Sequence, residues 1–162
     1  MQLKGRMFIV GDGMSNDGSK NVYEVVGNVI SKTGTMNYFH KYGVCMGGAS
    51  DDYGMVCGSN YNDQTACETF DGVATFTPVK KTNVPHHSYG AFTSVETKIL
   101  GKVTKIPVIL GNQDAIESWD EHDNVWTVEA TLELKEHTKY ASAVGINNSV
   151  YLFGKGLTVR VL

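Results

Sequence analysis

Five histidines are the residues of this chain best suited to bind a metal ion or to transfer protons near neutral pH. They are His40, His86, His87, His122 and His137. Three of them, His40, His87 and His137, recur at the same place in a repeated pattern, shortly before a tyrosine. Such a residue is more often a shared structural or surface feature than a ligand, because metal ligands must converge. We therefore predict no metal site and expect these three histidines to contact a protein partner on one face.

The other reactive side chains do not form a catalytic pattern. Cys45, Cys57 and Cys67 lack metal-type spacing, and we expect free, reduced thiols as in a cytosolic protein. The carboxylate pairs Asp51-Asp52 and Asp120-Glu121 fall in predicted turns, where solvated charge is the expected role. Since no nucleophile stands beside a recognisable base, we predict no catalytic residue and no cofactor.

A repeat marks the elements that must position these residues. Four hydrophobic runs each end on a glycine, and the closing glycines are 47, 53 and 43 residues apart. The runs are MFIVG ending at Gly11, MVCG at Gly58, PVILG at Gly111 and VYLFG at Gly154. A period of about 50 residues indicates a repeat array. We expect each glycine to allow a positive φ or a close backbone contact at a strand end.

Tyrosines and aromatic pairs recur with about the same period as the glycines. Tyr42, Tyr89 and Tyr140 are 47 and 51 residues apart, and a small residue follows each. The aromatic pairs of the second and third copies are Phe70 with Phe76 and Trp119 with Trp126. We expect the tyrosines and the pairs to pack between neighbouring units, with each tyrosine hydroxyl bonded to a buried acceptor.

Each period holds four short apolar runs separated by turn residues, which predicts four antiparallel strands. Units of this kind cannot bury both faces alone, and stacked around an axis they form a β-propeller. We therefore predict one all-β domain, a propeller segment of three to four four-stranded blades. The predicted units are a partial blade at 1–38, blades at 39–85 and 86–136, and a partial blade at 137–162.

This pattern resembles the kelch repeat of β-propellers over nearly the whole chain. In the third copy, Val108 to Gly154, a hydrophobic run ends on glycine, an aromatic residue precedes Asp120, and a tryptophan follows. Kelch units end the run on two glycines. This chain instead has Asp12, Ser59, Asn112 or Lys155 at the second position, so its repeats are degenerate.

The kelch resemblance implies a non-catalytic protein–protein interaction module, a scaffold or substrate-recognition segment that binds through the loops between strands. The expected binding residues lie in polar segments outside the strands: His40, Asn60, Tyr61, Lys80, Lys81, His87 and His137. The alternative is a propeller-fold enzyme, sialidase-like or copper-radical oxidase-like. About three and a half blades are too few for a closed kelch ring, so we expect a homodimer or a missing remainder to complete it.

Composition excludes several classes of partner. The net charge is −3, and Lys80-Lys81 is too short a basic run to bind nucleic acid. The apolar runs are too short to cross a membrane, and the first residues lack the hydrophobic stretch of a signal peptide. We therefore expect a cytoplasmic protein that binds neither nucleic acid nor membrane.

Overall fold

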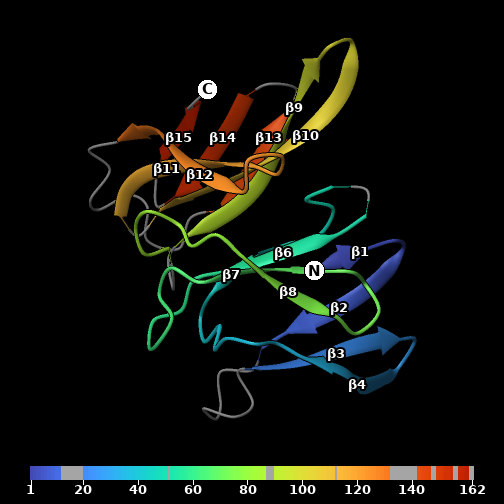
Figure 1. The fold of residues 1–162 in the computed structure, drawn as a ribbon. Coiled ribbons are helices and arrows are strands. Elements are labelled where there is room, and N and C mark those ends of the chain that lie inside the picture. The colour runs from blue at the N-terminus through green and yellow to red at the C-terminus, as the bar shows by residue number, and fades with distance from the viewer. Residues whose placement is uncertain are drawn as a thin grey trace.

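The computed structural model describes residues 1–11, 20–50, 52–86, 90–111, 113–131, 142–146, 149–154 and 157–160. These residues form fifteen β-strands in four antiparallel sheets, so the predicted all-β class is confirmed (Figure 1). This described part of the chain contains no helix long and apolar enough to cross a bilayer.

Each sheet consists of strands that follow one another in the sequence and pair in that order, and we number the sheets 1 to 4 along the chain. Sheet 1 holds β1 (Gln2–Leu3), β2 (Arg6–Val10), β3 (Asn21–Val26) and β4 (Val29–Thr35). Sheet 2 holds β5 (Val44–Met46), β6 (Gly54–Cys57), β7 (Cys67–Phe70) and β8 (Phe76–Val79). Sheet 3 holds β9 (Ala91–Ile99), β10 (Lys102–Gly111), β11 (Gln113–Asp120) and β12 (Val125–Thr131). Sheet 4 holds β13 (Ser142–Ile146), β14 (Ser149–Gly154) and β15 (Leu157–Arg160).

The first unit differs from its prediction. Residues 1–38 were expected to form a partial blade, but they contain a complete four-stranded sheet, because β1 pairs with the start of β2. Lys4 and Gly5 connect the two strands, and both have positive φ, at 52° and 74°. Two residues with positive φ make the tight turn whose twist suits a two-residue hairpin.

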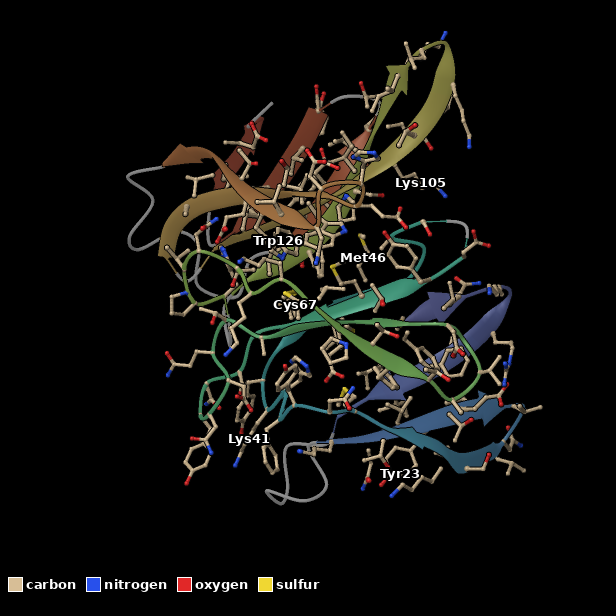
Figure 2. All side chains as sticks on the ribbon, viewed as in Figure 1. Tyr23, Lys41, Met46, Cys67, Lys105 and Trp126 are labelled. Atoms are coloured by element: carbon tan, nitrogen blue, oxygen red, sulfur yellow. A yellow bond between two sulfur atoms is a disulfide. The ribbon has the colours of Figure 1, made fainter. Side chains whose placement is uncertain are left out.

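Successive sheets pack face to face through three apolar cores, and Figure 2 shows Met46, Cys67 and Trp126 in the middle one. Sheets 1 and 2 share the cluster of Leu3, Phe8, Val22, Met36, Val56, Phe70 and Phe76. Sheets 2 and 3 share Met46, Ala49, Met55, Cys57, Cys67, Ile109, Trp119 and Trp126. Sheets 3 and 4 share Ala91, Val95, Val108, Leu110, Ile116, Val150 and Leu152. Every sheet therefore buries at least one face against a neighbour in the sequence.

The aromatic pairs lie in these cores, directly opposite each other in neighbouring strands. Phe70 and Phe76 stack with ring centroids 4.5 Å apart, and Trp119 and Trp126 lie 5.3 Å apart at a tilt of 46°. All four rings are buried. Each pair therefore fills the space between its own sheet and the preceding one.

Two of the repeat glycines sit where only glycine fits easily. Gly11 follows β2 and Gly58 follows β6, with φ of 72° and 73°. A Cβ on Gly58 would lie 1.6 Å from the carbonyl oxygen of His86, so this site also needs the missing side chain. Gly111 and Gly154 are the last residues of β10 and β14.

The prediction of free thiols is wrong for two of the three cysteines. Cys57 and Cys67 lie opposite each other in β6 and β7 and form a disulfide, with Cα atoms 4.2 Å apart. Cys45 is free. The expectation of a cytosolic compartment rested on reduced thiols, and the disulfide removes that support.

Reducing the disulfide should lower the free energy of unfolding. The bond closes a short loop, since the cysteines are 10 residues apart, and such a loop corresponds to about 2–3 kcal/mol. Urea unfolding with and without a phosphine reductant measures the difference. Cys45→Ala should respond to the reductant as the unmodified protein does, and equal stability under both conditions would contradict the disulfide.

Trp126→Ala should destabilise the protein by about 3–5 kcal/mol. The ring is buried between sheets 2 and 3, and its indole N–H donates to the carbonyl oxygen of Lys80 at 2.9 Å. Tyr61→Ala is the control, because Tyr61 is exposed and its loss should change stability by less than about 0.5 kcal/mol. Chemical unfolding followed by circular dichroism compares them, and similar values for both variants would show that Trp126 is not a core residue.

Candidate functional site

Three segments outside the strands join into one surface at one end of sheets 2 and 3. They are residues 36–43, 58–66 and 80–86, which lead into β5, β7 and β9. The amide of Asn60 donates to the carbonyl oxygen of Lys41 at 3.0 Å, and the amide of Thr82 donates to that of Thr65 at 2.9 Å. These backbone bonds make one continuous surface, which we call the loop surface.

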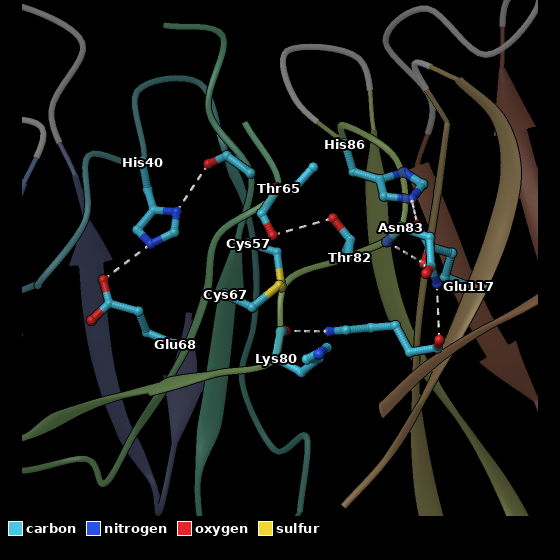
Figure 3. The surroundings of a disulfide bond; sticks show 12 residues. His40, Cys57, Thr65, Cys67, Glu68, Lys80, Thr82, Asn83, His86 and Glu117 are labelled. Atoms are coloured by element: carbon cyan, nitrogen blue, oxygen red, sulfur yellow. Dashed lines mark hydrogen bonds and ion pairs between the residues drawn. A yellow bond between two sulfur atoms is a disulfide. The ribbon is translucent and has the colours of Figure 1, made fainter. Parts of the chain in front are cut away.

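Beneath the loop surface, a buried carboxylate in β7 holds the first segment. Glu68 accepts hydrogen bonds at one oxygen from the backbone amide of Asn37 (2.9 Å) and from its side-chain amide (2.6 Å). Its other oxygen accepts from the amide of Tyr38 (2.8 Å) and lies 3.1 Å from Nε2 of His40. Figure 3 shows this His40–Glu68 pair beside the Cys57–Cys67 disulfide.

His40 extends the same network to the neighbouring loop. Its Nδ1 lies 2.9 Å from the carbonyl oxygen of Gly58, while its Nε2 faces Glu68. Both ring nitrogens thus face oxygen atoms, and the ring links Glu68 to the loop at Gly58. The Asn37 side chain also donates to the carbonyl oxygen of Phe76 in β8 at 2.9 Å. The segment entering sheet 2 is therefore bonded to β7, to β8 and to the loop after β6.

Sheet 3 repeats this arrangement almost atom for atom. Glu117 in β11 accepts from the backbone and side-chain amides of Asn83 (2.8 and 2.6 Å) and from the amide of Val84 (3.1 Å). Nε2 of His86 lies 2.9 Å from Oε1 of Glu117, the oxygen that also accepts from Val84, while Asn83 bonds to Oε2. The side chain of Asn83 also donates to the carbonyl oxygen of Trp126 at 2.9 Å. We call each set of asparagine, histidine and glutamate an anchor.

The anchors keep both glutamates charged although they have no exposed surface. Burial alone would raise the pKa of each carboxyl, but the hydrogen bonds from histidine and from the asparagine segment outweigh it. The pKa of Glu68 and the pKa of Glu117 are therefore both lowered from the ordinary value. A carboxylate with four donors is compensated for the loss of water, so each anchor is a stable buried ionic site.

His40 does not lie where the sequence placed it. His40 is only 4% exposed and faces inward, because Glu68 and the Gly58 carbonyl hold both ring nitrogens, so its prediction as a partner contact is wrong. The residue equivalent to His40 in sheet 3 is the buried His86, not His87. His87 and His137 lie outside the described residues, and their predicted role stays a prediction.

Tyr42 also differs from its prediction. It was expected to pack between units, but it is 57% exposed on the loop surface. Its φ of 55° places it in the left-handed region, and the turn directs the ring outward, with Lys41 Nζ 6.0 Å from its centroid. Tyr89 and Tyr140 lie outside the described residues.

The other predicted binding residues are exposed on the loop surface. Asn60, Tyr61, Lys80 and Lys81 all present their side chains to solvent. The buried Ser59 shapes this loop, because its hydroxyl accepts a hydrogen bond from the amide of Tyr61 at 3.2 Å. The bond between Asn60 and Lys41 thus joins the segments that carry Tyr42 and Tyr61. The backbone of Lys80 instead bonds to Asn124 and Trp126 of sheet 3 and its β11–β12 turn.

Sequence reasoning missed the anchor asparagines and glutamates. Asn and His three residues apart occur at Asn37 to His40 and again at Asn83 to His86, each just before a unit. A glutamate follows 28 or 31 residues after the histidine. This spacing is the signal that identifies the anchors. It was missed because two histidines are adjacent at His86-His87, and His87 was aligned with His40 in place of His86.

A hollow of about 550 Å³ lies at the opposite end of sheet 3, beside Tyr53, Trp119 and Glu121. Trp119 is buried, and its indole N–H has no hydrogen-bond partner among the described residues. Burial and the charge of Glu121 raise the pKa of the Tyr53 phenol. Asp120, predicted to be a solvated turn residue, accepts from the amides of His122 and Asp123 and so shapes the β11–β12 turn.

In the part of the chain that the structure describes, no three histidine, cysteine or acidic side chains gather as metal ligands do. Comparison with protein-family models found no match to this chain, and a search of curated proteins found none either.

Replacing an anchor glutamate should destabilise the protein in a pH-dependent way. Because the folded-state pKa of each carboxyl is lowered, its contribution is present above the ordinary value of 4.5 and is lost as the pH falls through the folded-state value. At pH 7, Glu68→Gln and Glu117→Gln should each cost about 2–3 kcal/mol, since buried donors lose their acceptor. Below pH 4 the difference in the free energy of unfolding between each variant and the unmodified protein should become smaller.

Urea unfolding between pH 3 and pH 8 measures this dependence. Glu96→Gln is the matched control, because Glu96 is exposed in β9 and should change stability little at any pH. A constant difference across the pH range would show that the anchors do not hold ionised carboxylates.

Proposed function

We propose that this chain is a segment of a kelch-type β-propeller that works as a non-catalytic protein-interaction scaffold. The observation that carries the proposal is the pair of anchors, which fix the loop surface onto a series of stacked sheets. Loops held on a rigid framework are suited to recognition, because little conformational entropy is lost when a partner binds.

The close approach between the first strands of neighbouring sheets supports the propeller. β9, the first strand of sheet 3, lies against both β5 and β13, the first strands of its neighbours. In β13, the amide of Gly145 donates to Oγ1 of Thr93 at 2.8 Å, and a Cβ on Gly145 would lie 1.6 Å from the carbonyl oxygen of Ser94. Sheets arranged around an axis approach most closely at their innermost strands, and the first strand is innermost in a propeller.

The chemistry of the loop surface supports a protein partner. Tyr42 and Tyr61 are exposed aromatic residues, which are enriched in protein interfaces. Lys41, Lys80 and Lys81 add positive charge on a chain whose net charge is −3. This combination suits an acidic protein surface with room for an aromatic side chain, and the lysines accelerate its approach.

Loss of the loop surface side chains should abolish partner capture without unfolding the protein. We expect Lys80→Ala/Lys81→Ala and, separately, Tyr61→Ala to reduce recovery of the bound partner at least tenfold in quantitative affinity capture. Leu100→Ala is the control, because Leu100 is fully exposed at the β9–β10 turn, away from the loop surface. Equal recovery by all variants would overturn the proposal, and a lowered melting temperature would instead assign these residues a structural role.

A further inference from the structure

The repeat glycines follow or end β2, β6, β10 and β14. Counting back from each glycine shows which side chains of the strand contact the preceding sheet and which contact the following sheet. The residue two positions before the glycine packs on the preceding sheet. Val56 packs with Phe8 and Val22 of sheet 1, and Ile109 packs with Met55 of sheet 2. Leu152 follows the same rule and packs with residues of sheet 3.

Residues one and three positions before the glycine point the other way, toward the following sheet. Phe8 packs with Val56 and Phe70 of sheet 2. In sheet 2 these positions are Met55 and Cys57, which pack on sheet 3, and in sheet 3 they are Val108 and Leu110, which pack on sheet 4. Each sheet therefore has a preceding face and a following face, distinguished by register.

Sheet 1 leaves its preceding face uncovered. Ile9 is the equivalent of Val56, Ile109 and Leu152, but it is 43% exposed, whereas those residues are 2%, 0% and 2% exposed. The residues that share its face by strand register are also mainly apolar: Met7, Tyr23, Val25 and Ile30, with the polar Gln2 and Lys32 beside them. Figure 2 shows Tyr23 on the side of sheet 1 that faces away from the other sheets.

Sheet 4 leaves its following face uncovered. Tyr151 and Phe153 stand three and one positions before Gly154, where the other sheets bury a residue against the following sheet. Phe153 is exposed, as is Val144, which lies opposite Tyr151 in β13. The described sheets thus leave two apolar faces of complementary type uncovered, the preceding face of sheet 1 and the following face of sheet 4.

We propose that a second copy of this chain covers both faces, with sheet 4 of each copy packed on sheet 1 of the other. The complementarity of the two faces points to this occupant, because the contact would repeat the register already used between sheets within the chain. Two copies of four sheets make a ring of eight, within the four to eight blades of closed propellers. The contact is head to tail, and such contacts close into rings when the rotation permits.

This inference rests on the propeller stacking of the proposed function but not on its loop surface. The loop variants Lys80→Ala/Lys81→Ala and Tyr61→Ala should therefore leave the assembly unchanged. Failure of partner capture with an intact dimer would thus count against the proposed function alone.

Light scattering behind a size-exclusion column tests the assembly. The protein should have twice the chain mass of 17.7 kDa. Ile9→Lys and Phe153→Lys should each convert it to a monomer with an unchanged circular dichroism spectrum, raising the dissociation constant about thirtyfold or more. Leu100→Lys, the matched control at a fully exposed turn, should remain a dimer. Met7→Lys and Ile146→Lys test the same two faces if either variant fails to fold.

Mixing the variants distinguishes a head-to-tail contact from a symmetric one. Ile9→Lys retains its sheet 4 face and Phe153→Lys retains its sheet 1 face, so the mixture should regain a dimer through one contact. A monomeric unmodified protein, a dimer that survives either substitution, or an assembly larger than two copies would each overturn the proposal.

Discussion

The fold depends on two buried carboxylates that must remain satisfied. Glu68 and Glu117 have no contact with solvent, and an unpaired charge in such a place would cost several kcal/mol. Each is compensated only when an asparagine and a histidine from the preceding segment reach it. This requirement couples the path of the chain between sheets to the strands within them. It explains why the segments entering sheets 2 and 3 follow the same course although their other residues differ.

The apolar cores hold neighbouring sheets together in addition to the anchors. The aromatic pairs fill the space between their sheet and the preceding one, while the residues before each glycine alternate between the two faces. The disulfide in sheet 2 lies in the same core as Trp119 and Trp126 and next to Glu68 in sequence. Polar anchors at one end and apolar packing in the middle together determine how neighbouring sheets meet. The exposed faces of sheets 1 and 4 follow from the same rule, because they are repeat faces without a neighbour.

The sequence predicts the sheets well because glycine, turn residues and paired aromatics recur about every 50 residues, with the closing glycines 43 to 53 residues apart. It does not predict the disulfide, since the pairing of Cys57 with Cys67 follows from strand register rather than from spacing alone. It misplaces Tyr42, because a positive φ at a residue other than glycine reverses the direction of the side chain. It overlooks the anchor glutamates, because an isolated glutamate in a strand is most often solvent-exposed. The buried role becomes visible only when the asparagine and histidine of the preceding segment are seen to meet it.

The anchors also define which stretch of chain can be duplicated as a whole. The described partners of Glu68 lie between residues 37 and 40, and those of Glu117 lie between residues 83 and 86. The anchor asparagines also donate to the carbonyl oxygens of Phe76 and Trp126, in the same units as the glutamates. A copy that begins at the asparagine carries its own donors and acceptor, so it inserts beside an existing unit without leaving a buried charge unpaired. A copy that begins at the first strand of a sheet would contain the glutamate but not its asparagine and histidine. The natural module of this architecture therefore starts in the linker, and recombination or engineered extension of the array is best made at that boundary.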